Sequence, residues 1–250
     1  MTTHNFFSVS GKGPNLVLLH GWKHDRHTWD SILPFLEANY TCWVIDLPGF
    51  GTNPRPKGTW SIPEYANWVK KTLIENNIKN PVLVGHSFGG RIVIELNKIV
   101  PDIRQNILYA TPGLRQPIPV FKSFAYSFYQ GLKKTNIIEH TKVIDKVSFM
   151  HKLRDKMRSS DYKEAGELKD IFLATIHYNL IPDMEGISKP TTLVWGTEDN
   201  IVPIKIGKEM LKIIPNSNMV PLEGLSHLAH LENPRLFSGK LLAILNNEHN

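Results

Sequence analysis

A serine flanked by glycines directly follows a short apolar run in the segment PVLVGHSFGGRIVIE, residues 81–95. The residues Gly85, His86, Ser87, Phe88 and Gly89 form a Gly-x-Ser-x-Gly pattern. In this context the pattern indicates a sharp strand-to-helix turn, where the glycines let neighbouring backbone pass close by. A hydroxyl raised above a sheet in this way can attack a carbonyl carbon once a base takes its proton. The sequence therefore predicts a nucleophile at Ser87.

Two histidines near the C-terminus are candidates for that base. The segment EGLSHLAHLENP, residues 223–234, contains His227 and His230, three positions apart. Histidines at this spacing can be metal ligands, a buried hydrogen-bonded pair or solvated side chains, and either one can serve as a general base. The spacing leaves these interpretations open, so the surrounding elements must decide among them.

Short apolar runs rich in β-branched residues alternate with segments of helical period along most of the chain. This alternation predicts a mostly parallel sheet with helices on both faces. Ser61 with Glu64 is typical of a capping box, and Asn233 with Pro234 is typical of an N-cap and first helical position. Ligands of such sheets lie beyond the carboxyl ends of the strands. The predicted strands are Leu16–Leu19, Cys42–Ile45, Val82–Val84, Asn106–Tyr109, Thr192–Trp195 and Met219–Leu222.

The alternation stops between about Pro112 and Gly186, where the sequence predicts no strand. We therefore expect a core domain made of residues 1–111 and 187–250, with a helical lid inserted at 112–186. Amphipathic stretches follow a proline-rich entry at about residues 120–134, 139–158 and 161–180.

Aromatic residues share one helical face of the first lid stretch, namely Phe121, Phe124 and Phe128. Such a face can line an acyl-binding pocket or simply pack the lid onto the core, and the periodicity fits both interpretations. The three phenylalanines are therefore candidates for pocket lining.

The chain resembles the α/β-hydrolase family over nearly its whole length apart from the lid. Five stretches carry the resemblance, each at the end of a predicted strand and in the family's order: LVLLHGW, DLPGFG, GHSFGG, PTTLVWGTEDNIVP and GLSHLAHLENP. The resemblance implies an α/β-hydrolase fold, in which helices flank a mostly parallel central sheet and a lid is inserted between two strands.

The resemblance also implies a catalytic triad of Ser87, Asp199 and His227. In such a triad the imidazole takes the serine proton, while the carboxylate fixes the imidazole tautomer. Asp199 is preferred to Glu198 because it matches the family's acid followed by a short apolar turn and a proline. His227 matches the family's Gly-x-x-His with Glu-x-Pro downstream, so His230 is expected to line the pocket or to hydrogen-bond to the elbow.

By the same resemblance, the backbone N–H groups of Trp22 and Phe88 form the oxyanion hole. Acyl transfer develops negative charge on oxygen, which preorganised donors stabilise. His86 is expected to be structural because the base must come from a separate strand end. His20 is expected to shape the loop after its strand and is a further candidate for pocket lining.

The loop KHDRHTW departs from the small residues that relatives commonly carry after HGW. Its residues Lys23 to His27 can bind a polar or anionic group of the substrate, or they form a solvated loop that leads into a helix, which we favour. His24 and His27 have a spacing that metal ligands use, but no further ligand cluster supports them. We therefore expect no metal site, and the proposed chemistry needs no cofactor.

Composition narrows the class of protein further. The chain has 250 residues, 41% of them hydrophobic and 21% charged, as is ordinary for one large globular domain. The net charge of +6 comes from scattered lysines, so we expect no nucleic-acid partner. No apolar run approaches the length of a bilayer span, no secretory signal is visible, and Cys42 stands alone, so we expect no membrane partner and a cytoplasmic location. The sequence makes no prediction of oligomeric state.

The leading hypothesis is a lid-bearing serine esterase that cleaves carboxylic esters through an acyl-enzyme. Three related reactions would use the same residues on a lactone, a thioester or a carbon–carbon bond. Cofactor-free perhydrolysis stays open as a side activity. The alternative from another class is a non-catalytic receptor for a small molecule on the same fold. Activity should fall on acidification, because a protonated histidine cannot act as the base.

Overall fold

The computed structural model describes residues 2–3, 6–114 and 166–246 of the chain. Two compact units divide the chain: residues 1–114 with 170–250, and residues 115–169. The first unit contains the sheet and the candidate residues Ser87, Asp199 and His227. The predicted lid, residues 112–186, lies mostly outside the described residues, as do its candidates Phe121, Phe124 and Phe128, and both stay predictions.

A single sheet of eight strands organises the described residues, in the order β1-β2-β4-β3-β5-β6-β7-β8. Neighbouring strands from β4 to β8 run parallel, whereas β1 and β2 pair antiparallel at one edge. All six predicted strands are confirmed; β1 and β2 were not predicted. The strands are β1 (Thr2–Thr3), β2 (Phe7–Gly11), β3 (Asn15–Leu19), β4 (Thr41–Ile45), β5 (Val82–His86), β6 (Gln105–Tyr109), β7 (Thr191–Gly196) and β8 (Ser217–Leu222).

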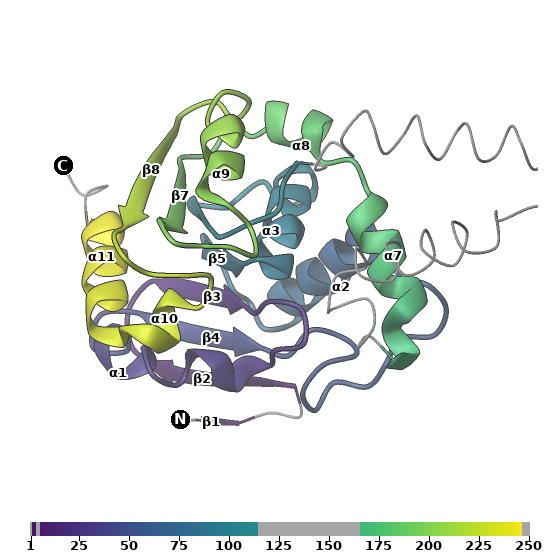
Figure 1. The fold of residues 1–250 in the computed structure, drawn as a ribbon. Helices are drawn as coiled ribbons and strands as arrows, with labels where there is room; N and C mark the ends of the chain where they lie inside the picture. The colour runs from purple at the N-terminus through teal and green to yellow at the C-terminus, as the bar shows by residue number, and fades with distance from the viewer. Residues whose placement is uncertain (1, 4–5, 115–165, 247–250) are drawn as a thin grey trace, which may run out of the picture. The chain divides into compact units, whose positions relative to one another are not determined.

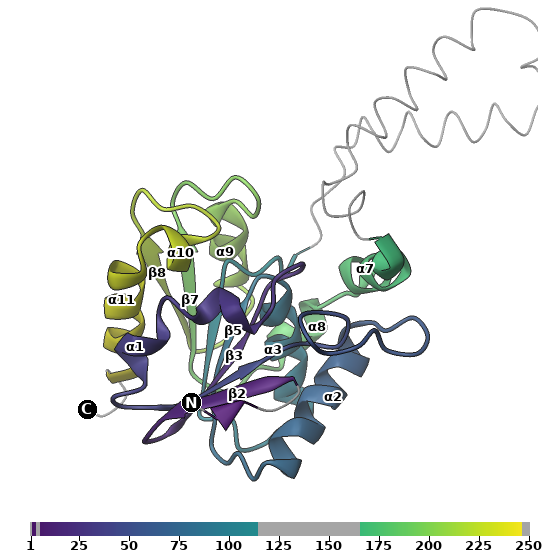
Figure 2. The same cartoon turned by 90° about the horizontal axis from the view of Figure 1, so that it is seen from below.

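Helices cover both faces of the sheet, which Figure 1 shows from one side. In Figure 2, α1 and α11 lie on one face and α2, α3 and α8 on the other. The described helices are α1 (Leu33–Leu36), α2 (Ile62–Glu75), α3 (Phe88–Ile99), α7 (Lys169–His177), α8 (Ile181–Glu185), α9 (Ile204–Met210), α10 (Ala229–Glu232) and α11 (Pro234–Asn246), with 3₁₀ turns η1 (Arg26–Trp29) and η2 (Gly166–Leu168).

Both predicted helix starts are confirmed. The Glu64 carboxylate accepts a hydrogen bond from the Ser61 backbone N–H at 2.7 Å, within a capping box at the start of α2. The Asn233 side chain accepts from the Leu236 N–H at 3.1 Å, and Pro234 is the first residue of α11. These local bonds satisfy N–H groups that a helix start leaves unpaired.

The central strands are apolar on both faces because helices cover both. Leu16 to Leu19 in β3 are fully buried, and all five residues of β5 and of β6 are buried. Each buried Leu, Ile or Val contributes about 1.5–3 kcal/mol relative to an exposed position. The sheet holds the C-terminal ends of β3, β5, β6, β7 and β8 side by side, and the loops after β3, β5, β7 and β8 carry the predicted site.

A buried arginine on α3 holds α7 in place. The Arg91 guanidinium donates to the Thr175 and Tyr178 carbonyls, both at 2.9 Å, and to the Pro112 carbonyl. Burial lowers the pKa of Arg91 to about 10, which leaves the side chain charged at neutral pH. Carbonyls at a helix C-terminus carry partial negative charge, so they suit a cation. The Arg91 side chain therefore hydrogen-bonds both to a carbonyl that precedes residue 115 in the sequence and to carbonyls that follow residue 169.

Candidate active site

Ser87 lies on a strained turn between β5 and α3. Its backbone angles are φ 49° and ψ −108°, which a non-glycine residue adopts only when its surroundings enforce it. The Ser87 N–H donates to the Tyr109 carbonyl at 2.8 Å, which continues the ladder between β5 and β6. A Cβ on Gly85 would collide with the Gly90 backbone, and one on Gly89 with the Leu19 carbonyl. Tight packing therefore explains both glycines of the pattern.

The Ser87 side chain has access to solvent although its neighbours in the chain do not. Ser87 is partly exposed, whereas His86 and Phe88 are buried. A nucleophile must meet its substrate, so this exposure fits the predicted role.

The loop after β3 lies against this turn. The Gly89 N–H donates to the His20 carbonyl at 3.1 Å, and a Cβ on Gly21 would lie 3.5 Å from the Ser87 Cβ. Trp22 follows Gly21 in the loop after β3, and Phe88 follows Ser87 at the start of α3, so both predicted oxyanion donors belong to segments beside the serine. Backbone N–H groups on two segments beside a nucleophile suit an oxyanion hole.

Asp199 and His227 form a buried pair. The His227 Nδ1 lies 2.7 Å from the Asp199 Oδ2, and the two residues are 4% and 7% exposed. The other carboxylate oxygen, Oδ1, accepts from the backbone N–H groups of Ile201 at 2.9 Å and Val202 at 2.8 Å. Because the carboxylate accepts at Nδ1, that nitrogen carries the hydrogen and Nε2 has the lone pair that a base needs. The competitor Glu198 is exposed.

His227 lies beside the turn that carries Ser87. The rings of His86 and His227 have centroids 4.8 Å apart, and His86 Nε2 donates to the His227 carbonyl at 3.1 Å. The Tyr109 hydroxyl donates to the same carbonyl at 2.8 Å. Tyr109 was not among the sequence candidates, although its place at the C-terminal end of a predicted strand marks the right edge of the sheet.

Glu232 braces the same loop from its other side. Its carboxylate accepts from the Ser226 N–H at 2.9 Å and from the Ser226 hydroxyl. The Glu-x-Pro pattern downstream of His227 therefore has a local structural use: it ties the residue before the histidine to the short helix α10.

Three further histidines near the site are buried and are kept neutral. Burial lowers the pKa of His20 to about 4 and that of His230 to about 3, and it holds the pKa of His86 well below its usual value. His20 accepts from the Leu47 N–H at Nε2, 3.0 Å, so its Nδ1 donates to the Gly21 carbonyl at 2.8 Å. With both nitrogens occupied, His20 supports the loop, as expected, and presents no free nitrogen to a substrate.

His230, the second histidine of the C-terminal pair, is also fully buried. Its Nε2 lies 2.9 Å from the Thr28 hydroxyl, and its Nδ1 lies 3.2 Å from the Tyr109 hydroxyl. Each ring nitrogen of His230 therefore lies within hydrogen-bond distance of a buried hydroxyl, Nε2 of that of Thr28 and Nδ1 of that of Tyr109.

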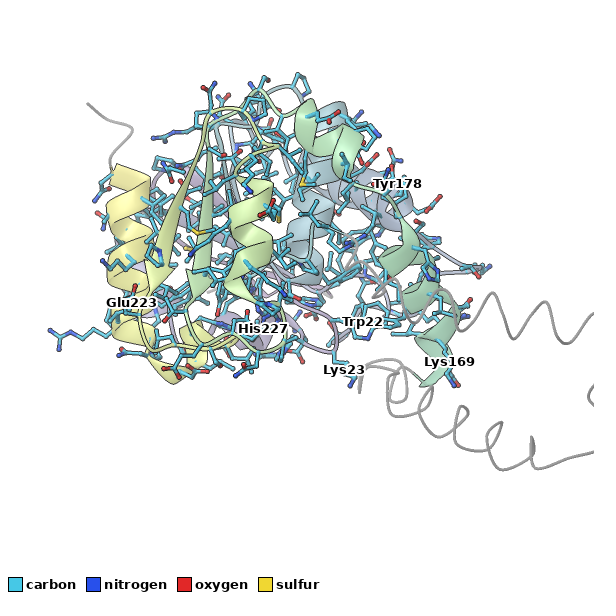
Figure 3. The ribbon with its side chains drawn as sticks, turned by 45° about the horizontal axis from the view of Figure 1, so that its top comes forward. Trp22, Lys23, Lys169, Tyr178, Glu223 and His227 are labelled. Carbon is cyan, nitrogen blue, oxygen red and sulfur yellow. The ribbon has the colours of Figure 1, made fainter. Side chains whose placement is uncertain are left out.

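Aromatic rings surround Trp22 on the side of the site away from His227. The Trp22 ring centroid lies 4.9 Å from that of Phe50, 5.3 Å from Phe88 and 5.0 Å from Phe172. Figure 3 shows Trp22 between His227 and α7, the helix that carries Phe172. Sequence reasoning missed Phe50 and Phe172. Phe50 belongs to the DLPGFG stretch, which carries the family resemblance and therefore marked its position. No sequence pattern marked Phe172.

The loop from Lys23 to His27 is partly structural. Arg26 is buried and pairs with Asp46: its backbone N–H donates to Oδ1 at 2.7 Å, and its guanidinium lies 3.4 Å from Oδ2. The Asp25 side chain accepts from the His27 N–H at 2.9 Å and caps η1. Arg26 is thus committed to Asp46, and the expectation of a solvated loop is wrong for this residue.

Residues 2–3, 6–114 and 166–246 contain no group of three or more His, Cys, Asp or Glu side chains placed to hold a metal ion. No helix in these ranges has the length and apolar character to cross a membrane.

The parallel sheet places a strained serine after β5 and a buried Asp-His pair after β7 and β8. This arrangement is typical of one class of enzymes. The chain belongs to the alpha/beta hydrolase family, whose family model matches residues 16–239. The fold expected from the sequence is thereby confirmed.

Individual relatives agree with this assignment. The uncharacterized hydrolase YugF of Bacillus subtilis is 28% identical over 89% of this chain and 86% of its own. A pimeloyl-[acyl-carrier protein] methyl ester esterase of Pseudoalteromonas atlantica is 27% identical over 88% of each chain. MenH from S. aureus superposes with a TM-score of 0.72 at 24% identity, over 99% of this chain and all of its own. The chain is therefore similar to hydrolases along most of its length.

Proposed function

We propose that this protein is a serine hydrolase that cleaves carboxylic esters through an acyl-enzyme. The observation that carries the proposal is the 2.7 Å pair of Asp199 and His227, whose loop touches the strained turn of Ser87. The similarity to a methyl ester esterase supports an ester as the substrate class.

In the proposed reaction, the Ser87 hydroxyl attacks the ester carbonyl while Nε2 of His227 takes its proton. The carbonyl oxygen becomes an oxyanion, which the N–H groups of Trp22 and Phe88 would stabilise. His227 then gives the proton to the departing alcohol, and the acyl group stays on Ser87. Water, deprotonated by the same histidine, releases the acid and restores the serine. Asp199 stabilises the imidazolium in both steps.

The aromatic residues around Trp22 favour an apolar group on the substrate. Phe50, Phe88 and Phe172 are each at least nine-tenths buried, and their rings pack around Trp22 in an uncharged aromatic cluster. Apolar surfaces with few polar groups are typical of small-molecule sites. A cytoplasmic location, a small-molecule ester or lactone as the substrate, and the absence of a nucleic-acid or membrane partner stay predictions from the sequence.

A covalent probe tests the proposal directly. The purified protein should hydrolyse p-nitrophenyl esters and should be labelled by a fluorophosphonate, and Ser87→Ala should lose both. Ser217→Ala is a matched control, because Ser217 lies at the start of β8 and donates to the Ile214 carbonyl. Binding of esters without turnover or labelling would favour the receptor alternative.

A panel of substrates separates the enzyme alternatives. Lactones, thioesters and carbon–carbon substrates should be compared with esters by kcat/KM, since all four require the same serine. A lactone or thioester turned over faster than every ester would keep the triad but replace the proposed substrate class.

A further inference from the structure

A line of buried polar side chains connects the loop after β3 to the carbonyl of His227. The Tyr109 hydroxyl lies 2.8 Å from this carbonyl and 3.2 Å from Nδ1 of His230. Nε2 of His230 lies 2.9 Å from the Thr28 hydroxyl, which is 3.4 Å from Nδ1 of His24. Tyr109 and His230 are fully buried, and Thr28 is 7% exposed. Five polar groups thus form one continuous path.

The direction of each hydrogen bond follows from the carbonyl at its end. A carbonyl only accepts, so the Tyr109 hydroxyl donates to it and must accept from the Nδ1–H of His230. A neutral His230 then has its lone pair at Nε2, which accepts from the Thr28 hydroxyl. Burial lowers the pKa of His230 to about 3, which agrees with a neutral ring. The Thr28 oxygen in turn accepts from Nδ1–H of His24. Thr28, His230 and Tyr109 each donate once and accept once along the path, His24 only donates and the His227 carbonyl only accepts, so the path has one polarity.

His86 supplies a second donor to the same carbonyl. Its Nε2 lies 3.1 Å from the His227 oxygen, so Nε2 carries the hydrogen, and Nδ1 has no partner among the described residues. The His227 carbonyl accepts two hydrogen bonds from buried side chains and can accept no more. Such a fully occupied carbonyl fixes the peptide that follows the histidine and thereby the position of its ring.

The same path joins the two loops that the proposed reaction needs. The Ser31 hydroxyl donates to the His230 carbonyl at 3.1 Å, beside the bond between Thr28 and His230. Thr28 and Ser31 follow Trp22 in the segment after β3, whereas His230 follows His227 in the segment after β8. The segment with a predicted oxyanion donor is therefore bonded directly to the segment with the base.

We propose that Tyr109, His230 and His86 are positioning residues that hold the base His227 through its backbone carbonyl. The proposal rests on the proposed function, since it assigns these residues to the same reaction. None of them touches the reacting atoms. They act by keeping Nε2 of His227 aligned with Ser87, and a misplacement of about 1 Å in such a site can cost about 10²-fold in rate.

Tyr109→Phe tests the proposal because it removes one hydroxyl and keeps the ring. We expect kcat for a p-nitrophenyl ester to fall about 10- to 100-fold with KM changed less than about twofold. Tyr65→Phe is the matched control, since Tyr65 also donates from a buried hydroxyl to a backbone carbonyl, that of Pro48 at 2.9 Å. The control should lose similar thermal stability and keep kcat. Equal kcat losses in the two variants would overturn the proposal.

His230 offers a rescue experiment. His230→Leu removes both ring nitrogens, whereas His230→Asn retains an N–H donor near the position of Nδ1. The proposal predicts that kcat falls further in the leucine variant than in the asparagine variant. If both lose kcat equally, or neither does, the directed path to Tyr109 is not what positions His227.

A spectroscopic readout separates this proposal from the proposed function. The hydrogen shared by His227 and Asp199 should give a low-field proton resonance in the NMR spectrum of the intact protein, whether or not the protein hydrolyses esters. Tyr109→Phe should shift or broaden that resonance, and Tyr65→Phe should leave it unchanged. A wild type that neither labels nor turns over would defeat the proposed function alone. An unchanged resonance in Tyr109→Phe would defeat the positioning role.

Discussion

The two sides of the candidate site are built from different interactions. On one side, His227 is held by directional bonds: its Nδ1 to Asp199 at 2.7 Å, and its carbonyl to Tyr109 and His86 at 2.8 and 3.1 Å. On the other side, Trp22 contacts the rings of Phe50 and Phe172 at centroid distances of 4.9 and 5.0 Å. The indole nitrogen of Trp22 is buried and has no hydrogen-bond partner among the described residues.

This difference assigns the catalytic step to the hydrogen-bonded side of the site and the selection of substrate to the aromatic side. Hydrogen bonds with fixed donors and acceptors allow one geometry, which a proton-transferring base requires. Ring contacts are less directional and tolerate small displacements at little cost. We therefore expect changes on the hydrogen-bonded side to act on kcat, and changes on the aromatic side to act on KM and on the choice of substrate.

The largest effect should come from removing the base. His227→Ala is expected to lower kcat by about 10⁶-fold, since the members of a triad act as a unit. His230→Ala should lower kcat far less, because His230 acts through Tyr109. Steady-state rates of ester hydrolysis for both variants test the assignment. Greater loss in His230→Ala would exchange the roles of the two histidines.

Asp199→Asn should have the next largest effect. The amide is nearly isosteric but donates a hydrogen bond where the carboxylate accepts, so His227 would adopt the wrong tautomer, and kcat should fall about 10⁴-fold. Glu198→Gln is the control at the exposed neighbouring position. A small loss in Asp199→Asn with a large loss in Glu198→Gln would make Glu198 the acid.

Most of the fold was predictable because the strands are short, apolar and separated by clear helix starts. The strand β2, Phe7–Gly11, was missed because it reads FSVSG, with serines at alternate positions. Both serines are nonetheless buried, at 1% and 8% exposed, which hydrophobic patterning does not anticipate. Such a strand is specified by its antiparallel pairing with β4, and that pairing is not visible in local sequence.

The candidate triad was also predictable, because each member belongs to a motif at the end of a strand. The residues behind it were not. Tyr109 was placed at the end of a strand without a role, and Thr28 belonged to a loop expected to be solvated. Their contact with His230 joins positions 121 and 202 residues distant from it in the sequence. No local pattern encodes a hydrogen bond over such separations.

Acid should destabilise the hydrogen-bonded side in particular. His20 and His230 have pKa values lowered to about 4 and about 3, so they stay neutral in the folded protein while the unfolded chain binds protons near pH 6.5. Their contribution to stability is complete above pH 6.5 and is lost as the pH falls toward these values. As the pH falls from 7 to 5, protonation of each of these two histidines in the unfolded chain should lower the free energy of unfolding by roughly 2 kcal/mol.

Urea unfolding at the two pH values measures this loss. His230→Asn should reduce the difference in unfolding free energy between pH 7 and pH 5 by roughly 2 kcal/mol, because asparagine does not bind the proton. A variant with the same pH dependence as the wild type would mean that His230 is protonated in the folded state. It would then also contradict the direction assigned to the bond between the Thr28 hydroxyl and Nε2 of His230, because a protonated ring donates from both nitrogens.

The smallest effect should come from the aromatic side. Phe172→Ala removes a ring that packs against Trp22 and should raise KM for esters with bulky apolar acyl groups, lowering kcat/KM roughly tenfold. The value of kcat should stay within about twofold, because Phe172 packs against the Trp22 ring, whereas the proposed reaction uses only the backbone N–H of Trp22. Phe172→Leu keeps an apolar side chain of intermediate size. Its kcat/KM for these esters should lie between that of Phe172→Ala and that of the wild type. Kinetics over a series of acyl chain lengths distinguish the two sides. If Phe172→Ala instead lowers kcat equally for short and long esters, the aromatic side also positions the reacting groups, and the division between chemistry and selection does not hold.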